Sequence, residues 1–349
     1  MSGTEDQLLL VKQEALPPND WVLVDTEDII RHYFSLKHDA GALYEQWSQN
    51  DANFRRKAPR FTGIRILSQD AWEALIGFIC SSNNNISRIS QMVHKLCLHY
   101  GPPVARIEGG GDESEVLHDF PDAAALAGAG VEAHLRQLGF GYRAKYIAET
   151  ARIVSQERPP EWLESLTNPE NPGLGADEKY GRLDRATYRE AHEQLLALAG
   201  VGPKVADCVC LMGLGWGEAV PVDTHVWQIA QRDYRLGGAK SKTFSKAMYD
   251  AVGDHFRGIW GSQAGWAQSV LFTANLKTFS DRPAAAAKPE ELPGVKIEVE
   301  DKIVLEEAKP KTKRKRAVLT ETVKFESVSV KVEDDGDVKR RRTRSSTRK

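Results

Sequence analysis

The 349-residue sequence lacks any long apolar run and any recognisable leader. No stretch approaches the roughly 20 apolar residues that a helix needs to cross a bilayer, so we expect no membrane association. The polar, partly acidic start Met1–Asp6 has neither the basic and apolar regions of a secretory signal nor the Arg-rich character of a transit peptide. These absences indicate an intracellular protein.

Cysteine is also scarce, with four residues: Cys80, Cys97, Cys208 and Cys210. Their spacing matches neither a zinc site nor the four closely spaced cysteines of an iron–sulfur cluster. In a reducing compartment, free thiols are the default state of cysteine. We therefore expect free thiols, no metal and no diffusible cofactor.

A net positive charge is missing as well, because the whole chain carries −2. The balance is uneven: residues 281–349 have 19 Lys and Arg against 14 Asp and Glu, an excess of +5 that leaves −7 for residues 1–280. A folded part of that charge cannot attract nucleic acid through a broad positive field. If it binds DNA, it must use backbone amides, helix N-termini and a few arginines.

The sequence divides into three segments. Residues 1–26 form a short lead, residues 27–280 show nearly continuous helical patterns with a surface insertion at about 157–184, and residues 281–349 have the composition of a disordered charged tail. No strand pair is expected, because no alternating segments are joined by Asn-Gly or Asp-Gly. Apolar spacing and capping residues predict helices over 72–79, 142–156, 224–232 and 264–276.

The most informative stretch runs from Leu195 to Tyr234. A helix ends near Ala199, Gly200-Val201-Gly202 forms a tight turn, and a second helix begins at Pro203. Gly200 and Gly202 permit a left-handed backbone and a close approach, so the turn can point its amides at a phosphate. Taken alone, the turn is more typical of an ordinary connection between two helices.

Lys204, in the first turn of that second helix, is the candidate nucleophile. An amine attacks only when neutral, and burial beside the positive end of a helix favours the neutral form. Such an amine can displace a base from a sugar, leave a Schiff base and permit β-elimination. Asp223 can stabilise positive charge on the sugar, and Cys208 lies on the same helix face as Lys204. The alternatives are a phosphate-contacting lysine, a simple N-cap and a core cysteine.

Four blocks in register resemble the eukaryotic 8-oxoguanine DNA glycosylases of the helix-hairpin-helix superfamily. They are GVGPKVADCVCLMGL with AVPVDTHVWQIAQRDY, FICSSNNNISRI at 78–89, LGFGYRAKYI at 138–147 and AGWAQSVLF at 264–272. The resemblance covers about residues 27–280. It implies a mainly α fold, a helix-hairpin-helix DNA glycosylase core, and a monomer acting on double-stranded DNA that contains 8-oxoguanine paired with cytosine.

The resemblance also implies residue roles. Lys204 corresponds to the nucleophile and Asp223 to the catalytic aspartate. Cys208 and Phe272 match the residues that sandwich the flipped base, and Gln268 matches the one that bonds its Watson–Crick edge. The DNA contacts comprise Asn83, which fills the gap, Arg88 and Arg143, which read the orphaned cytosine, Tyr142, which wedges beside it, and His225, Gly200 and Gly202 at phosphates. Singly, each of these residues also has a structural explanation as a cap, core or ion-pairing residue.

Three departures from the family pattern stand out. The family carries an N-terminal β domain of about a hundred residues, whereas only some 26 residues precede the first helix, so we expect that domain to be largely absent. Its glycine contact to the oxidised base has no match here. Asn275 replaces an aspartate, and Ala199 and Pro203 replace Pro and Thr in the hairpin.

The tail contains two basic clusters, Lys311–Arg316 and Lys339–Arg344, which favour nuclear targeting or nonspecific DNA binding over a merely solvated charge run. Val-Lys-x-Glu at Lys296, Lys324 and Lys331 resembles a SUMO acceptor pattern. We therefore expect localisation to the nucleus, with the mitochondrion as a further site.

The sequence as a whole predicts a bifunctional glycosylase and abasic-site lyase that works through a Lys204 Schiff base. The alternatives are a catalytically impaired damaged-DNA-binding protein or truncated isoform, and a superfamily member with another damaged-base substrate.

Overall fold

The computed structural model describes residues 26–108, 114–173, 186–237 and 245–276. All of them belong to one compact unit, residues 1–285, and the second unit, residues 286–349, lies outside the described residues. The elements in chain order are α1 (Thr26–Tyr33), α2 (Ala40–Asn50), α3 (Ala52–Lys57), η1 (Ala58–Arg60), α4 (Ala71–Ser81), α5 (Ile86–Tyr100), β1 (Pro103–Glu108), β2 (Ser114–His118), α6 (Val131–Gln137), α7 (Arg143–Arg152), the π-helix η2 (Ile153–Glu157), α8 (Trp162–Ser165), α10 (Tyr188–Leu196), α11 (Pro203–Met212), α12 (Thr224–Tyr234), α13 (Lys246–Trp260), η3 (Gly261–Gln263) and α14 (Ala264–Asn275).

The helices expected from the sequence are confirmed. The capping residues of α4 and α12 accept hydrogen bonds from backbone amides of the first helical turn. Asp223 accepts a hydrogen bond from the Val226 amide and so starts α12, while Asp70 does the same for α4. Thr187 and Glu190 form a reciprocal capping box at the start of α10. Side-chain acceptors thus satisfy amides that a helix start leaves free.

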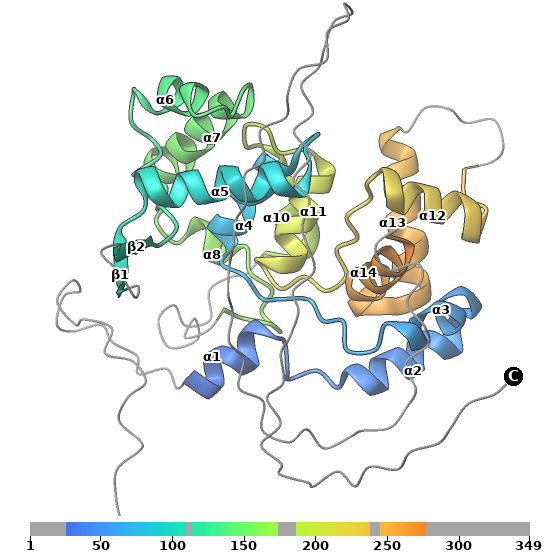
Figure 1. Cartoon of the computed structure of the whole chain (residues 1–349). Helices are drawn as coiled ribbons and strands as arrows, with labels where there is room; N and C mark the ends of the chain where they lie inside the picture. The colour runs from blue at the N-terminus through green and yellow to red at the C-terminus, as the bar shows by residue number, and fades with distance from the viewer. Residues whose placement is uncertain (1–25, 109–113, 174–185, 238–244, 277–349) are drawn as a thin grey trace, which may run out of the picture. The chain divides into compact units, whose positions relative to one another are not determined.

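Two hydrophobic cores organise the described residues. The first joins α4 to α8 with α10 and α11, and the second joins α2 and α3 to α12, α13 and α14. Figure 1 shows these as two helix groups, with the yellow α11 between them. The chain passes from the first core to the second through residues 213–223, which join the end of α11 to the start of α12.

Two expectations fail. β1 and β2 form an antiparallel hairpin, with Ile107 opposite Glu115, although no strand pair was expected. The sequence between them is GGGDE rather than an Asn-Gly turn, so the usual hairpin signal is missing. The expected surface insertion also contains core residues: Trp162 and Leu163 of α8 are each 8% exposed.

Candidate active site

The hairpin between α10 and α11 has one strained glycine and one open glycine. Gly200 has φ +76°, and a Cβ added there would lie 2.6 Å from Tyr146, so only glycine fits. Gly202, the N-cap of α11, has φ −98° and no atom within 4 Å of an added Cβ. The Thr150 hydroxyl donates to the Ala199 carbonyl at 2.9 Å and ties the turn to α7.

Lys204 is the second residue of α11 and is half-buried. Its Nζ lies 4.9 Å from the centre of the Phe78 ring. The Lys204 side chain lies close enough to the Cys208 thiol, one turn later, to lower its pKa, and the Asp223 charge acts on the same thiol. The structure therefore brings Lys204, Cys208 and Asp223 together.

Cys208 is a neutral thiol near pH 7. Burial raises its pKa to about 11, although the Lys204 charge acts in the opposite direction. Cys208 is 3% exposed. It therefore offers a soft, uncharged surface beside the amine rather than a thiolate nucleophile.

Asp223 is half-buried, and its Oδ1 accepts the Val226 amide at 2.8 Å. The preceding residue is also fixed, because the Val222 amide donates to the Tyr249 hydroxyl at 3.3 Å. Tyr249 in turn donates to Asp207 of α11 at 2.5 Å. This chain of bonds sets the start of α12 relative to the helix that carries Lys204.

Asp207 is the centre of a buried network that sequence reasoning missed. It is 2% exposed, accepts the Tyr188 hydroxyl at 2.6 Å, and lies 3.5 Å from His192 Nε2. Burial raises its pKa, while His192 and the two tyrosines oppose that shift. The only signal in the sequence was a carboxylate in the apolar run VADCVCLM. Its partners lie on α10 and α13 and are visible only once the fold is known.

The predicted base-binding residues of α14 lie one turn apart. Gln268 is 5% exposed, and its amide has no hydrogen-bond partner among the described side chains and backbone. Phe272 is half-buried and meets the exposed His225 ring edge-on, with ring centres 6.0 Å apart. The Gln268 amide atoms are not among the fully buried, unpaired polar atoms of the described residues, so they remain accessible to a ligand. His225 lies in the first turn of α12, two residues after Asp223.

The residues predicted to contact the gap in the DNA duplex and the DNA strand opposite the lesion lie near the end of α4. Arg143 is 2% exposed and donates to the carbonyls of Ser82 and Asn83, the latter at 3.0 Å. Its guanidinium also lies over the Tyr142 ring at 4.6 Å. Asn83 has the left-handed φ of +48°, which these bonds support. Arg143 therefore holds the loop.

The remaining members of this group face solvent. Tyr142 is 47% exposed and donates to the Ser82 carbonyl at 3.0 Å. Arg88 is exposed and donates to the Gly139 carbonyl at 3.0 Å. Asn83 is exposed as well. Asn275, at the end of α14, accepts from Arg232 Nη1 at 2.9 Å.

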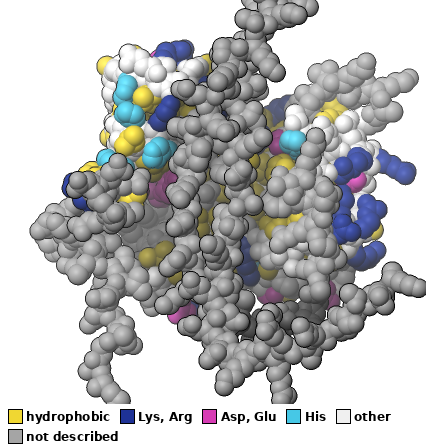
Figure 2. Space-filling model, in the orientation of Figure 1, with side chains coloured by type: hydrophobic (Ala, Val, Ile, Leu, Met, Phe, Trp, Pro, Cys, Tyr) yellow, Lys and Arg dark blue, Asp and Glu magenta, His cyan; other side chains and the backbone are white. Residues whose placement is uncertain are grey.

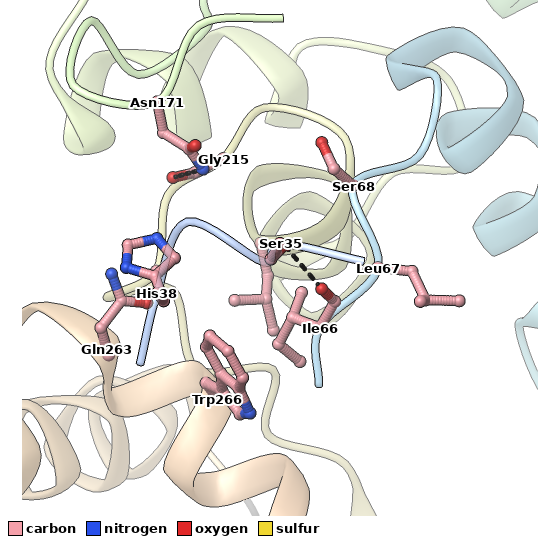
Figure 3. Close-up of a pocket in the computed structure, with 11 residues that line it drawn as sticks. Ser35, His38, Ile66, Leu67, Ser68, Asn171, Gly215, Gln263 and Trp266 are labelled. Atoms are coloured by element: carbon pink, nitrogen blue, oxygen red, sulfur yellow. Dashed lines mark hydrogen bonds between the residues drawn. The ribbon is translucent and has the colours of Figure 1, made fainter. Parts of the chain in front are cut away.

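A separate hollow is lined by residues of several elements, including His38, Asn171, Gln263 and Trp266 (Figure 3). Its volume is about 20 Å³, which is room for about one water molecule. None of the residues predicted for the site lines it. Its small size fits a hydrated seam rather than a base pocket.

Two further features are absent from the described residues. They contain no group of three or more His, Cys, Asp or Glu side chains placed to hold a metal ion. No described helix is long and apolar enough to cross a membrane.

The comparisons with known proteins agree with this geometry. Residues 76–251 match the HhH-GPD superfamily of base excision DNA repair proteins, and residues 4–75 match the 8-oxoguanine DNA glycosylase N-terminal domain. The second match extends well past residue 26, where we expected the remnant of that domain to end.

Two curated relatives are N-glycosylase/DNA lyases. The one from Saccharomyces cerevisiae is 41% identical over 70% of this chain and 65% of its own length. The one from Arabidopsis thaliana is 39% identical over 67% of this chain and 58% of its own. The chain therefore spans about three fifths of the length of these relatives.

A solved structure is also similar. It is the Clostridium acetobutylicum 8-oxoguanine glycosylase/lyase in complex with double-stranded DNA containing cytosine opposite 8-oxoguanine. The TM-score is 0.55 at 30% identity, and the match covers 71% of this chain and 74% of that one. The family-model match, the relatives and this shared fold together show that the chain belongs to the HhH-GPD superfamily of base excision DNA repair proteins, among the 8-oxoguanine DNA glycosylases.

Proposed function

We propose that this protein excises 8-oxoguanine paired with cytosine from duplex DNA and then cleaves the strand at the abasic site. The observation that carries the proposal is the meeting of an amine, a thiol and a carboxylate, Lys204, Cys208 and Asp223, at the starts of two helices. The names of the two lyase relatives and the DNA in the Clostridium complex support this reaction and substrate.

The chemistry begins at the amine. The neutral Lys204 nitrogen attacks C1′ of the extruded nucleotide, and the bond from C1′ to the base breaks, with its electron pair and then a proton going to the base. The sugar ring opens to a Schiff base on Lys204. Loss of a C2′ proton then expels the 3′ phosphate, and hydrolysis returns the free amine.

Asp223 stabilises the sugar as this happens. Positive charge develops on the sugar when the base leaves, and a half-buried carboxylate close to it lowers the energy of that state. Because one oxygen already accepts the Val226 amide, the carboxylate stays in place. Tyr249 and Asp207 act as positioning residues through Val222.

The extruded base is held by groups that suit a flat heteroaromatic ring. The neutral Cys208 thiol and the Phe272 ring contact its two faces, and the Gln268 amide bonds its polar edge. Asn83 fills the gap left in the duplex, Arg88 and Arg143 read the orphaned cytosine, and Tyr142 lies beside it. Arg143 also holds the loop in shape through its bond to the Asn83 carbonyl. Backbone amides at Gly200 and Gly202 and the His225 ring contact phosphates.

Borohydride trapping on a duplex with 8-oxoguanine opposite cytosine tests the proposal. Reduction of the Schiff base leaves a covalent protein–DNA adduct, which we expect from the native chain and from the control Lys246→Gln on exposed Lys246 of α13, but not from Lys204→Gln. An adduct that persists in Lys204→Gln contradicts the proposed nucleophile. DNA binding without any adduct indicates a non-catalytic binder, and an adduct with another lesion alone indicates another substrate.

We further propose a monomer, as the family resemblance implies, located in the nucleus, with the mitochondrion as a second location. The basic clusters Lys311–Arg316 and Lys339–Arg344 that support nuclear targeting lie outside the described residues. The SUMO-like lysines 296, 324 and 331 also lie outside them. Mass spectrometry that finds these three lysines unmodified in cells removes the SUMO proposal.

A further inference from the structure

Six cationic side chains gather on α3, η1 and the end of α12, on a surface we call the α3 patch. Figure 2 shows Lys and Arg side chains grouped at the right-hand edge of the molecule, where Figure 1 places α3 and α12. The members of the patch are Arg55, Arg56, Lys57, Arg60, Arg232 and Arg235. All except Lys57 are exposed.

Asp233 joins the two halves of the patch. Its carboxylate, 8% exposed, accepts Lys57 Nζ at 2.5 Å and Arg232 Nη2 at 2.7 Å. The Asn53 amide of α3 also donates to the Asp233 carbonyl at 3.0 Å. The hydrogen bond from Arg232, followed by the contributions of Lys57, lowers the pKa of Asp233 to about 2. The patch is therefore built on a fixed and charged carboxylate.

The patch remains strongly positive after its acids are counted. Against six cations stand two carboxylates, Asp233 and the 6%-exposed Asp51, which leaves +4. Residues 1–280 as a whole carry a net charge of −7, so the α3 patch is a positively charged surface on a negatively charged part of the chain.

The arginines also keep donors for a ligand. Arg55 donates to the Ser48 carbonyl at 3.3 Å and Arg56 to the Asn53 amide oxygen at 3.1 Å. Arg60 and Arg235 have no acidic partner among the described residues. Since a guanidinium has five N–H donors in a planar fork, several forks here remain open to phosphate oxygens.

The patch lies too far from the proposed site to bind the phosphates next to the flipped nucleotide. The helix α12 begins after Asp223, at the proposed site, and ends at the patch. Its 11 residues span about 16 Å at 1.5 Å per residue. The start of α12 thus lies at the proposed lesion site, and its opposite end carries Arg232 and Arg235.

We propose that the α3 patch binds the phosphate backbone of a second DNA segment while the Lys204 site faces the first. This inference rests on the proposed action on DNA. Arginine forks match phosphate geometry, and a local +4 surface on an otherwise acidic fold concentrates that attraction in one place. Two backbone-binding surfaces at opposite ends of α12 allow the protein to pass directly from one DNA segment to another.

A chase experiment on undamaged DNA tests this. The full chain is bound to a labelled 20-base-pair duplex and chased with rising concentrations of unlabelled duplex. If a second segment binds before the first leaves, the dissociation rate rises with chase concentration. We expect Arg55→Gln/Arg56→Gln/Arg60→Gln to lower the dependence of the dissociation rate on chase concentration at least about threefold, because three cations that bind phosphate are lost. Each lost phosphate contact should also reduce the slope of log affinity against log salt concentration by about 0.9.

The matched control is Arg106→Gln/Arg136→Gln/Arg152→Gln, which removes the same charge from exposed positions on β1, α6 and α7. An equal dependence on chase concentration in both triple variants overturns the proposal. So does a patch variant that slows single-turnover excision from a short lesion duplex, because the patch would then contact the first segment. If the triple variant unfolds, Arg60→Gln/Arg235→Gln replaces it.

This design separates the two proposals. Failure of excision by the native chain sinks the glycosylase assignment, whereas the chase uses undamaged DNA and reports on the patch alone.

Discussion

Replacing each hairpin glycine with alanine separates what the hairpin does for the fold from what it does for DNA. At Gly200 the backbone is left-handed, with φ +76°, which costs an alanine about 1–2 kcal/mol. The new Cβ would also lie 2.6 Å from Tyr146, and relieving such overpacking costs about 1–3 kcal/mol. Gly200→Ala should therefore lower the free energy of unfolding by about 2–5 kcal/mol.

Gly202→Ala should behave in the opposite way. With φ −98° and no atom within 4 Å of its Cβ, alanine fits the fold, so the free energy of unfolding should stay within about 1 kcal/mol of the native value. The added methyl group, however, would stand on the exposed N-cap of α11, where the proposal places a phosphate. We expect a loss in DNA affinity of about tenfold, or 1.4 kcal/mol.

Urea denaturation measures the first quantity, and fluorescence anisotropy with a lesion duplex at fixed salt measures the second. The reasoning is refuted if Gly200→Ala is as stable as the native chain, or if Gly202→Ala binds DNA normally. The comparison is informative because the two residues are two positions apart in one turn and receive the same methyl group.

Three further predictions follow from buried polar groups. Tyr249→Phe removes a bond to Asp207 and should cost about 1.5–3 kcal/mol in urea denaturation; it should also slow single-turnover excision, and an unchanged excision rate contradicts the positioning role. Arg143→Ala frees the carbonyl of Asn83, so hydrogen exchange in the 82–85 loop should rise and lesion affinity should fall at least about tenfold. Asp233 has a folded pKa of about 2, below its unfolded value near 3.8, so it adds stability above pH 4 that is lost as the pH falls toward 2. After discounting for solvent screening, the stability gap between the native chain and Asp233→Asn should be about 1–2 kcal/mol at pH 6 and close to zero at pH 2; a constant gap contradicts it.

Local signals explain why so much of the helical core could be predicted. Asp223 caps α12 through an amide three residues away, and Pro203 starts α11, so both boundaries depend on neighbours in the sequence. The turn between α10 and α11 likewise needs a glycine at Gly200 for reasons visible in its own backbone. Cys208 meets Lys204 because residues four apart share a helix face.

Long-range packing explains what could not be predicted. Asp207 is held by Tyr188 and Tyr249, which lie 19 and 42 residues away, and no pattern in either segment points to the carboxylate. Trp162 is buried because its segment returns to the first core, although its neighbours are rich in Pro and Glu. Arg143 was predicted to read a base, and only the fold shows that it bonds two carbonyls of the loop.

In the proposed reaction, the Asp223 carboxylate has to lie near the Lys204 amine without forming an ion pair with it. A carboxylate in contact with a lysine holds it as an ammonium ion, which has no lone pair with which to attack a sugar. Among the described residues, no ion pair joins Lys204 to Asp223, and the amine instead meets the Phe78 ring and the neutral Cys208 thiol. Asp223 accepts the Val226 amide and the Tyr249 hydroxyl accepts the Val222 amide, so these two bonds fix the start of α12 and the position of Asp223. The N-cap of α12 is therefore a folding signal and, in the proposed reaction, also the restraint that positions the carboxylate beside the amine.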